Sequence, residues 1–525
     1  MSDFSPTPAL PRADEKAGVR LKSDTARPVA LQLWPVFRLV TLGAVTTVAL
    51  ALVGASLASG RSAAARSEPI VTHGVVVGDV TDDSAVVWAR ASRAATLRVT
   101  LQGGPHRQPR PLAVDADDDF TGQLRVEGLA AGRTYRYRVR FDNGPVVTGA
   151  FRTAPANDDG AAVRLAFGGD LAGQNVCRDA AEGFPIADTI RRWQPDVFVG
   201  LGDMIYADNA CDPVGRYGNA QLPGGFGPAT DLPGFWAHWR YNRADPPLQR
   251  LLASAAYVGV WDDHEVVNDF GPLHDTRSTP PYMPGVHLLP IGLDAFLDYT
   301  PIASALESPG RLYRSLRWGR HLELFVLDTR QYRDANSAVD SAAAPKTMLG
   351  REQLQWLNER LAASTATWKV VVSSVPMSIP TGFPAENGRD GWANFDQATG
   401  FEHELLGILR GATARGDHMV WITTDVHFAE AFRYRPFADR PGFVVHELAT
   451  GPLNAGIFPI RDVDPTLVPE VLSFYGPATA TDVTSWTEAK RWFNFGTLEV
   501  SRNGSLTAGI VNTAGERVFA VELEP

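Results

Sequence analysis

Apolar and polar residues alternate along several short segments between residues 69 and 156. Ser84–Ala89 and Thr96–Leu101 follow this pattern, and Tyr135–Phe141 alternates strictly between apolar residues and arginine. A period of two is typical of β-strands that bury one face. Because Gly, Pro and Asp residues separate the segments, the pattern predicts a small β-sandwich over residues 69–156.

After residue 157 the pattern changes to short apolar runs separated by segments with helical spacing. The runs predict buried strands at Val163–Phe167, Val197–Leu201, Tyr257–Val260, Leu322–Leu327, Val370–Val372 and Met419–Thr423. The helical spacing predicts helices that carry Ile186, Ile190 and Trp193, then Leu354, Leu357 and Leu361, and another helix near His403–Arg415. Together they predict an α/β domain over residues 162–525, closed by strands at Thr497–Val500, Leu506–Val511 and Val518–Leu523.

Leu39–Ser59 contains no charged residue and is about long enough to cross a bilayer as a helix. Basic residues precede it, so we expect a disordered, Pro-rich tail over residues 1–38 to stay in the cytoplasm and the rest of the chain to be exported. Ser62–Ala65 offers small residues that suit signal-peptidase cleavage. Two localisations therefore stay open: a cell-membrane protein with an extracytoplasmic domain, or a secreted protein.

Hydrophobic residues make up 44% of the chain and charged residues 21%, which is ordinary for a globular protein. The net charge of −10 argues against a stable nucleic-acid partner held by a broadly basic surface, although a local basic cleft is compatible with it. Cys177 and Cys211 are the only cysteines. In an exported protein this pair favours one disulfide over two free thiols.

Four short acidic motifs directly follow, or end, apolar runs of the strand type. Since ligands gather at the carboxyl ends of strands in α/β sheets, each motif is placed where a site can assemble. Turn-forming polar residues account for any one motif but fit the whole set poorly. The motifs are Phe167–Asp170, Gly202–Tyr206, Trp261–Glu265 and Thr424–His427.

The motifs suit a centre of two metal ions, which needs a bridging carboxylate, flanking ligands and an open position for water. Asp203 is the natural bridge between the ions. Asp170, Tyr206 and His427 would complete one site. Its phenolate and imidazole suit a transition metal such as iron.

The other site would consist of oxygen ligands alone. Asp263 and Asp425 would supply it, and such a site suits calcium, magnesium or manganese. His264 lies beside Asp263 and has no evident ligand role. Its imidazole suits protonation of a leaving oxygen or stabilisation of charge on a phosphoryl group.

The ordered motifs GDMIYAD, WDDHEVVND, LFVLDTRQYR and TDVH resemble those of the PhoD-like alkaline phosphatases, within the metallophosphatase superfamily. The similarity runs from about His73 to the C-terminus, and Gly128–Tyr137 resembles the corner of a fibronectin type III-like domain. The resemblance implies a four-layer α/β/β/α metallophosphatase fold preceded by a small fibronectin type III-like β-sandwich. It also implies an exported hydrolase of phosphate mono- or diesters, with Fe³⁺ and Ca²⁺ in its best-known type.

The resemblance assigns metal-binding positions by motif match to Asp203, Tyr206, Asp263, Asp425 and His427. His264 matches the histidine of the superfamily's GNH motif, in which Asp263 replaces the asparagine. Asp170 is a departure, because the type member has a cysteine there. Aspartate is a harder ligand than thiolate, so Mn²⁺, Mg²⁺ or Zn²⁺ stay open beside iron and calcium.

Other residues of these motifs have less direct roles. Arg330 lies in the DTRQYR run and is expected either to bind phosphate or to form a structural salt bridge. Asp262 and Glu265 flank the metal-binding motif and are expected to support the ligands, with a purely structural role equally open for Asp262.

The main hypothesis is an exported metal-dependent phosphoesterase, in which a metal-bound hydroxide attacks the phosphate ester. One alternative is a phospholipase D-type hydrolase of lipid headgroups, because an anchored enzyme would lie beside lipid and residues 282–290 and 451–460 are apolar. A second alternative is a non-catalytic envelope protein that only binds. The oligomeric state stays open.

Overall fold

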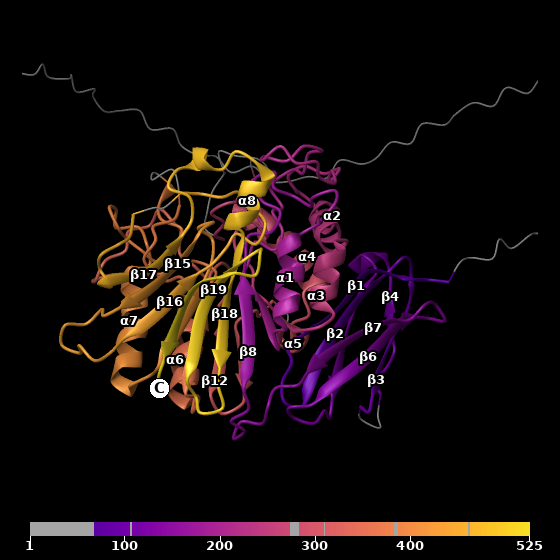
Figure 1. The fold of residues 1–525 in the computed structure, drawn as a ribbon, viewed down its shortest axis with the longest axis horizontal. Helices are drawn as coiled ribbons and strands as arrows, with labels where there is room; N and C mark the ends of the chain where they lie inside the picture. Colours follow the sequence, from indigo (N-terminus) through magenta and orange to yellow (C-terminus); the bar gives the residue numbers. More distant parts are fainter. Residues whose placement is uncertain (1–67, 105–107, 273–282, 309, 383–386, 460–461) are drawn as a thin grey trace, which may run out of the picture. The chain divides into compact units, whose positions relative to one another are not determined.

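The computed structural model of the chain describes residues 68–104, 108–272, 283–308, 310–382, 387–459 and 462–525 (Figure 1). The predicted tail over residues 1–38 and the predicted membrane segment 39–59 lie outside these ranges. Within the described ranges, no helix combines the length and the apolar character that a membrane crossing requires.

The larger of the two main sheets has nine strands in the order β20-β19-β18-β8-β9-β10-β1-β2-β5. At its centre, β8 (Val163–Gly168), β9 (Val197–Gly200) and β10 (Ala256–Gly259) run parallel. Parallel pairing brings the carboxyl ends of these three strands to one edge of the sheet. The other strands are β1 (Val71–Gly78), β2 (Ser84–Ala91), β5 (Thr121–Glu127), β18 (Asn494–Val500), β19 (Leu506–Asn512) and β20 (Arg517–Leu523).

The second main sheet has seven strands in the order β11-β12-β13-β14-β16-β15-β17. Four neighbouring strands run parallel, namely β12 (Leu322–Val326), β13 (Trp368–Val372), β14 (Met419–Thr423) and β16 (Val445–Ala449). Antiparallel strands complete it: β11 (Arg314–Trp318), β15 (Ala429–Tyr434) and β17 (Pro469–Tyr475).

The two main sheets pack face to face through alternate apolar residues of their strands. Leu165 and Val199 of the larger sheet lie in the same buried cluster as Val370 and Ile422 of the second sheet. The residues between them in sequence point to the other side, where Phe198 belongs to a second core under the outer helices. Each central strand is therefore buried on both faces, which explains why these strands read as continuous apolar runs.

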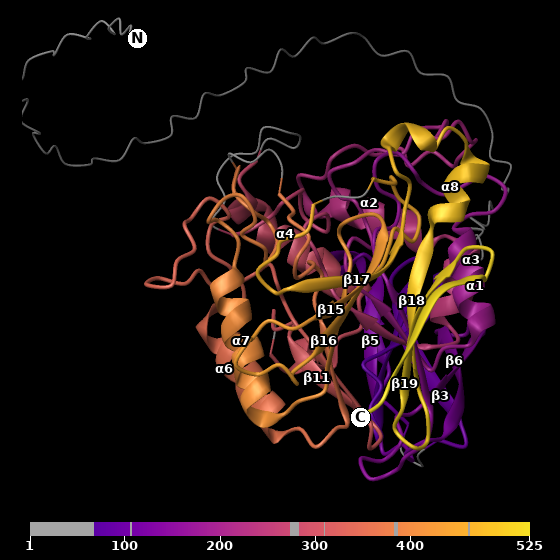
Figure 2. The same ribbon diagram turned by 60° about the vertical axis from the view of Figure 1, so that its left-hand side comes forward.

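Helices cover the outer face of each main sheet (Figure 2). The larger sheet carries α1 (Pro185–Trp193), α2 (Leu232–Arg243), α3 (Pro246–Leu252) and α4 (Gly285–Tyr299), and the second sheet carries α6 (Gly350–Ala363) and α7 (Glu402–Arg415). Shorter helices are α5 (Ala303–Glu307), α8 (Trp486–Trp492) and the 3-10 turns Ala116–Asp118 and Ala480–Asp482. The layers follow the order helix, sheet, sheet, helix, as predicted.

The N-terminal segments form the strands that their alternation predicts. A four-stranded sheet in the order β4-β3-β6-β7 packs against β1 and β2, with Val99 and Tyr137 in the same core as Val87. Its strands are β3 (Ala95–Gln102), β4 (Leu112–Val114), β6 (Thr134–Phe141) and β7 (Val147–Arg152). Because β1 pairs in parallel with β10, one sheet of this sandwich continues into the larger main sheet. The division into domains at residues 69–156 and 162–525 stays a prediction.

Cys177 and Cys211 form the disulfide that the sequence favoured, with their Cα atoms 5.8 Å apart. The bond joins the loop after β8 to the loop after β9. These loops also carry Asp170 and Asp203, so the disulfide ties together two segments of the predicted site.

Replacement of both cysteines by serine should lower the free energy of unfolding by about 4 kcal/mol, since the bond closes a loop across a sequence separation of 34 and restricts the unfolded chain. Urea unfolding under oxidising conditions measures the difference. Reductant should bring the wild-type protein to the same midpoint as the variant. Equal midpoints for oxidised wild type and variant would contradict the prediction.

Candidate metal centre

The four acidic motifs meet where the carboxyl ends of the two main sheets face each other. Asp170, Asp203 and Asp263 follow β8, β9 and β10, whereas Asp425 and His427 follow β14 of the second sheet. All of these side chains are buried except that of the partly exposed Asp425. Residues this far apart in sequence come together in a functional site, whereas the polar residues of unrelated turns would stay apart.

Several of these residues have a left-handed backbone. The φ angles are 62° at Asp170, 52° at Asp203, 78° at Asp425 and 61° at His427. Non-glycine residues adopt this conformation rarely, at a cost on the order of 1 kcal/mol each, and such strain gathers at functional sites. The strained turns aim the side chains at one another rather than along the sheets.

Asp170, Tyr206 and His427 lie together, as the sequence predicted. The Tyr206 hydroxyl is 3.0 Å from His427 Nε2 and 3.4 Å from Asp170 Oδ1. The other ring nitrogen of His427, Nδ1, faces the carbonyl oxygen of Gly456. A carbonyl at Nδ1 fixes the tautomer and leaves Nε2 with a lone pair that can bind a cation.

The remaining carboxylates form a second, overlapping group. Single oxygens of Asp262, Asp263 and Asp425 lie within 4.8 Å of one another, and the same holds for atoms of Asp203, Asp263 and His264. Oδ2 of Asp203, Asp262 and Asp425 is buried and has no hydrogen-bond partner among the residues that the structure describes. A buried carboxylate oxygen without a partner is costly, so these atoms need a positive ligand.

Burial and repulsion raise the pKa of these carboxyl groups. Burial, followed by repulsion from Asp263, raises the pKa of Asp203 well above its usual range, and burial with repulsion from Asp262 does so for Asp425. Burial also raises the pKa of Asp170 to about 7. Such a group of carboxylates ionises fully only beside positive charge. The donor set and its unpartnered oxygens therefore fit metal cations.

Glu265 holds the backbone of two of these loops. Its carboxylate accepts hydrogen bonds from the backbone N–H groups of Asp203 (2.9 Å), Met204 (2.8 Å) and Asp262 (2.7 Å). Burial raises its pKa to about 8, against the lowering by these hydrogen bonds. Glu265 thus fixes the loop after β9 to the loop after β10, in agreement with a supporting role.

Arg330 is fully buried behind the carboxylates. Its Nε donates to Asp262 at 2.6 Å, and its two terminal nitrogens donate to Asp390 at 2.8 Å each. A further contact of 3.7 Å links it to Asp263. The guanidinium is engaged by protein carboxylates rather than open to a substrate, which is the geometry of the salt-bridge alternative.

The family model of the PhoD-like phosphatases matches residues 166–503 of the chain, and the model of their N-terminal domain matches residues 56–155. The chain belongs to the PhoD-like phosphatase family. A curated relative is alkaline phosphatase D of Bacillus subtilis, which is 28% identical over 342 residues. The matched region covers 58% of this chain and 55% of that relative, so the chain spans about half of the relative's length.

Two solved structures have the same fold. The structure of PhoD has a TM-score of 0.68 at 19% identity and covers 87% of this chain and 93% of its own. A purple acid phosphatase from yellow lupin seeds has a TM-score of 0.56 at 12% identity, with 87% and 74% covered. These likenesses confirm the predicted metallophosphatase fold of this PhoD-like chain.

Asp208 contacts the imidazole of His264 and was not singled out from the sequence. Its Oδ1 is 2.7 Å from His264 Nδ1, and its Oδ2 accepts a hydrogen bond from the backbone of Asn268. Burial would lower the pKa of His264, but Asp208 and Asp263 outweigh it and raise that pKa to about 10. The sequence feature that could have identified Asp208 is its place as the last acidic residue of the GDMIYAD motif, five positions after Asp203.

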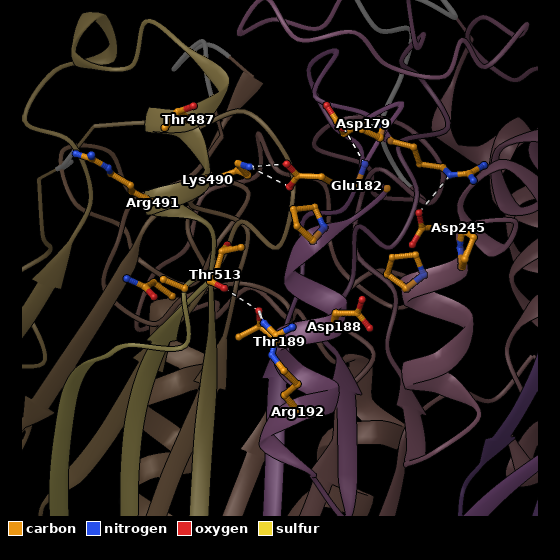
Figure 3. A pocket seen from close by; sticks show the side chains of 18 of the residues that line it. Asp179, Glu182, Asp188, Thr189, Arg192, Asp245, Thr487, Lys490, Arg491 and Thr513 are labelled. Carbon is orange, nitrogen blue, oxygen red and sulfur yellow. Dashed lines mark hydrogen bonds and ion pairs between the residues drawn. The ribbon is translucent and has the colours of Figure 1, made fainter.

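A wide cleft of about 1340 Å³ lies elsewhere on this PhoD-like chain (Figure 3). Side chains of α1 and α8 line it, and Lys490 bridges to Glu182 across it at 2.8 Å. Neither the predicted ligands nor His264 line this cleft. Its acidic and basic groups are mixed and largely paired, so size alone does not make it the reaction site.

Replacement of Arg330 by glutamine should lower the free energy of unfolding of chelator-treated protein by about 3–5 kcal/mol, since buried carboxylates lose their counter-charge. Urea unfolding measures the loss. The matched control is Arg517→Gln, which breaks an ion pair of a 43% exposed arginine and should cost less than about 1 kcal/mol. Equal small losses would contradict the interpretation of Arg330 as the buried counter-charge of these carboxylates.

Proposed function

We propose that this chain is an exported, metal-dependent phosphoesterase that hydrolyses phosphate mono- or diesters at the converging carboxylates. The observation that carries the proposal is the set of buried, unpartnered carboxylate oxygens of Asp203, Asp262 and Asp425. Membership of the PhoD-like family supports the reaction class. The apolar segment 39–59 supports export.

The ligand roles follow from the two overlapping groups. Asp203 would bridge, Asp170, Tyr206 and His427 would hold one cation, and Asp263 and Asp425 would hold the other. Bound cations would polarise the phosphoryl oxygens and lower the pKa of a water molecule for attack. Iron suits the first group and calcium the second, with manganese, magnesium and zinc as the competing metals.

Asp170 would bias the first group towards harder metals than a cysteine would. Its Oδ2 accepts a hydrogen bond from Thr424 at 2.7 Å, which leaves Oδ1 on the side of Tyr206 and His427. Metal analysis of the purified protein distinguishes these assignments, because iron and calcium would be retained in similar amounts if the proposal holds.

His264 would transfer the proton to the leaving oxygen. Asp208 holds its Nδ1, so Nε2 is the nitrogen left to carry that proton. The Tyr206 ring, whose centroid is 4.1 Å from that of His264, packs against the imidazole and restricts its rotation. Arg330 would act indirectly, by holding Asp262 and Asp263 in place.

The phospholipase D-type alternative stays a prediction without a structural observation in its favour. Residues 451–457 are buried, and residues 285–290 begin α4, where Val286 is exposed. Comparison of headgroup release from phosphatidylcholine with cleavage of a chromogenic diester separates the two activities.

Replacement of Asp203 by asparagine should reduce turnover of bis(p-nitrophenyl) phosphate by at least about a hundredfold and remove metal from the protein, because the bridging ligand is lost. Chelator should abolish wild-type turnover, and added metal should restore it. Asp158→Asn is the charge-matched control at an exposed position. Wild-type turnover in Asp203→Asn would disprove the bridging role.

Replacement of His264 by glutamine should lower kcat about 10²–10⁴-fold for alkyl phosphate esters and much less for p-nitrophenyl esters, whose leaving group needs no proton. Asp208→Asn should shift kcat the same way by about 10–100-fold. Asp212→Asn, an exposed substitution in the same loop, is the control. Equal losses for both ester types would mean that His264 does not protonate the leaving oxygen.

A further inference from the structure

Arginines gather on the outer face of the four-stranded sheet β4-β3-β6-β7. Arg98 of β3 and Arg136, Arg138 and Arg140 of β6 are all exposed, whereas the residues between them are buried. The register places Arg98 directly opposite Arg140. We name these four residues the arginine face.

The charge of the arginine face is not compensated within the sheet. Its four strands contain five arginines and no aspartate or glutamate. The fifth, Arg152, is paired with Asp196, but none of the other four forms an ion pair with any described residue. Like charges directly across a strand pair are destabilising, so this arrangement costs the fold some stability.

The concentration of positive charge is unexpected because the chain as a whole has a net charge of −10. A face that costs stability and opposes the overall charge suits an anionic partner. The composition of the chain left such a local basic region open, and the strict alternation of β6 produces it.

The arginine face is hollowed rather than flat. Arg98, Arg138 and Arg140 line a groove of about 480 Å³, and Pro109, Pro111 and Val146 are among its other lining residues. Successive arginines of β6 are two residues apart, which spaces their backbones by about 7 Å along the strand. A row of charges in a groove matches a chain of anions better than a single ion or a planar bilayer.

We propose that the arginine face binds a linear phosphodiester polymer through its phosphate groups. Guanidinium groups present paired donors that match phosphate oxygens, and several weak contacts along one polymer add up. Thr100 and Gln102 lie opposite Arg138 and Arg136 and add neutral donors to the same face. Binding here does not require that the polymer be cleaved.

The test compares two full-length variants of equal charge. R98Q/R136Q/R138Q/R140Q removes the arginine face, and R216Q/R351Q/R440Q/R502Q removes exposed arginines elsewhere. Each changes the net charge from −10 to −14, since four positive charges are lost. The probe is a fluorescent oligothymidylate of about 20 nucleotides, a phosphodiester chain whose charge is carried by its phosphate groups. Anisotropy is measured in excess chelator, so that the probe is not hydrolysed.

Wild type and the control variant should bind the probe, with log K falling against log salt concentration at a slope of about −3, from four contacts at about 0.7 each. The arginine-face variant should bind at least tenfold more weakly at low salt, with little remaining salt dependence. Because the substituted side chains are exposed and form no ion pair with a described residue, its thermal unfolding midpoint should be equal to that of wild type or slightly higher, since like charges across the strand pair are removed. If it unfolds, R136Q/R138Q is measured in the same way, with about half the loss in slope.

Four outcomes would overturn the proposal. The first two are an equal loss of probe binding in both variants and no loss of probe binding in either. The second pair is an arginine-face variant that loses binding only to phosphatidylglycerol vesicles, or one whose oligomeric state in sedimentation differs from that of wild type. The second pair would identify a bilayer or a second copy of the chain as the occupant. Turnover of bis(p-nitrophenyl) phosphate should be unchanged in the arginine-face variant. A wild-type chain that binds the probe but cleaves no ester would refute the proposed function and leave this inference standing.

Discussion

Mutual repulsion of buried carboxylates is the constraint on which the rest of the structure depends. Asp203, Asp262 and Asp263 are buried close together, and the partly exposed Asp425 lies beside Asp262 and Asp263. Isolated ionised carboxylates in such a place are very unfavourable. The surrounding chain therefore has to supply positive charge or hydrogen-bond donors to them. Arg330 supplies positive charge to Asp262, and Glu265 holds the backbone of the loop after β9. Oδ2 of Asp203, Asp262 and Asp425 still has no hydrogen-bond partner among the described residues.

The architecture makes this concentration of charge possible. Parallel strands of two sheets end at one place, so loops that are distant in sequence meet without long excursions. The strands beneath them are buried on both faces, which gives the loops a rigid base. That rigidity maintains the left-handed turns at Asp170, Asp203 and Asp425. The disulfide between Cys177 and Cys211 adds a covalent limit on the same loops.

Patterns that are local in sequence were predictable, and contacts that depend on tertiary packing were not. Apolar runs identified the central strands, because burial on both faces leaves no polar position in them. The acidic motifs at their ends located the candidate ligands. The ion pair of Asp390 with Arg330 was not predictable, because the two residues are 60 positions apart and the neighbours of Asp390 form no motif. The pairing of β1 with β10 in the larger sheet was also not predictable, because the alternation of apolar and polar residues does not show which strand lies next to another.

The distribution of charge also sets an order of events in the proposed reaction. A phosphate ester is an anion, and the candidate site presents aspartates to it. Approach of the substrate before the cations would bring like charges together in a region of low dielectric. In the proposed reaction the cations would therefore bind before the substrate. The carboxylates that disfavour the substrate in the metal-free chain would then hold the cations that attract it. Arg330 does not replace the cations in this role, because its donors are held by Asp262 and Asp390. The arginine face lies on a sheet that contributes none of these site residues, so it can hold an anionic polymer without entering this sequence of steps.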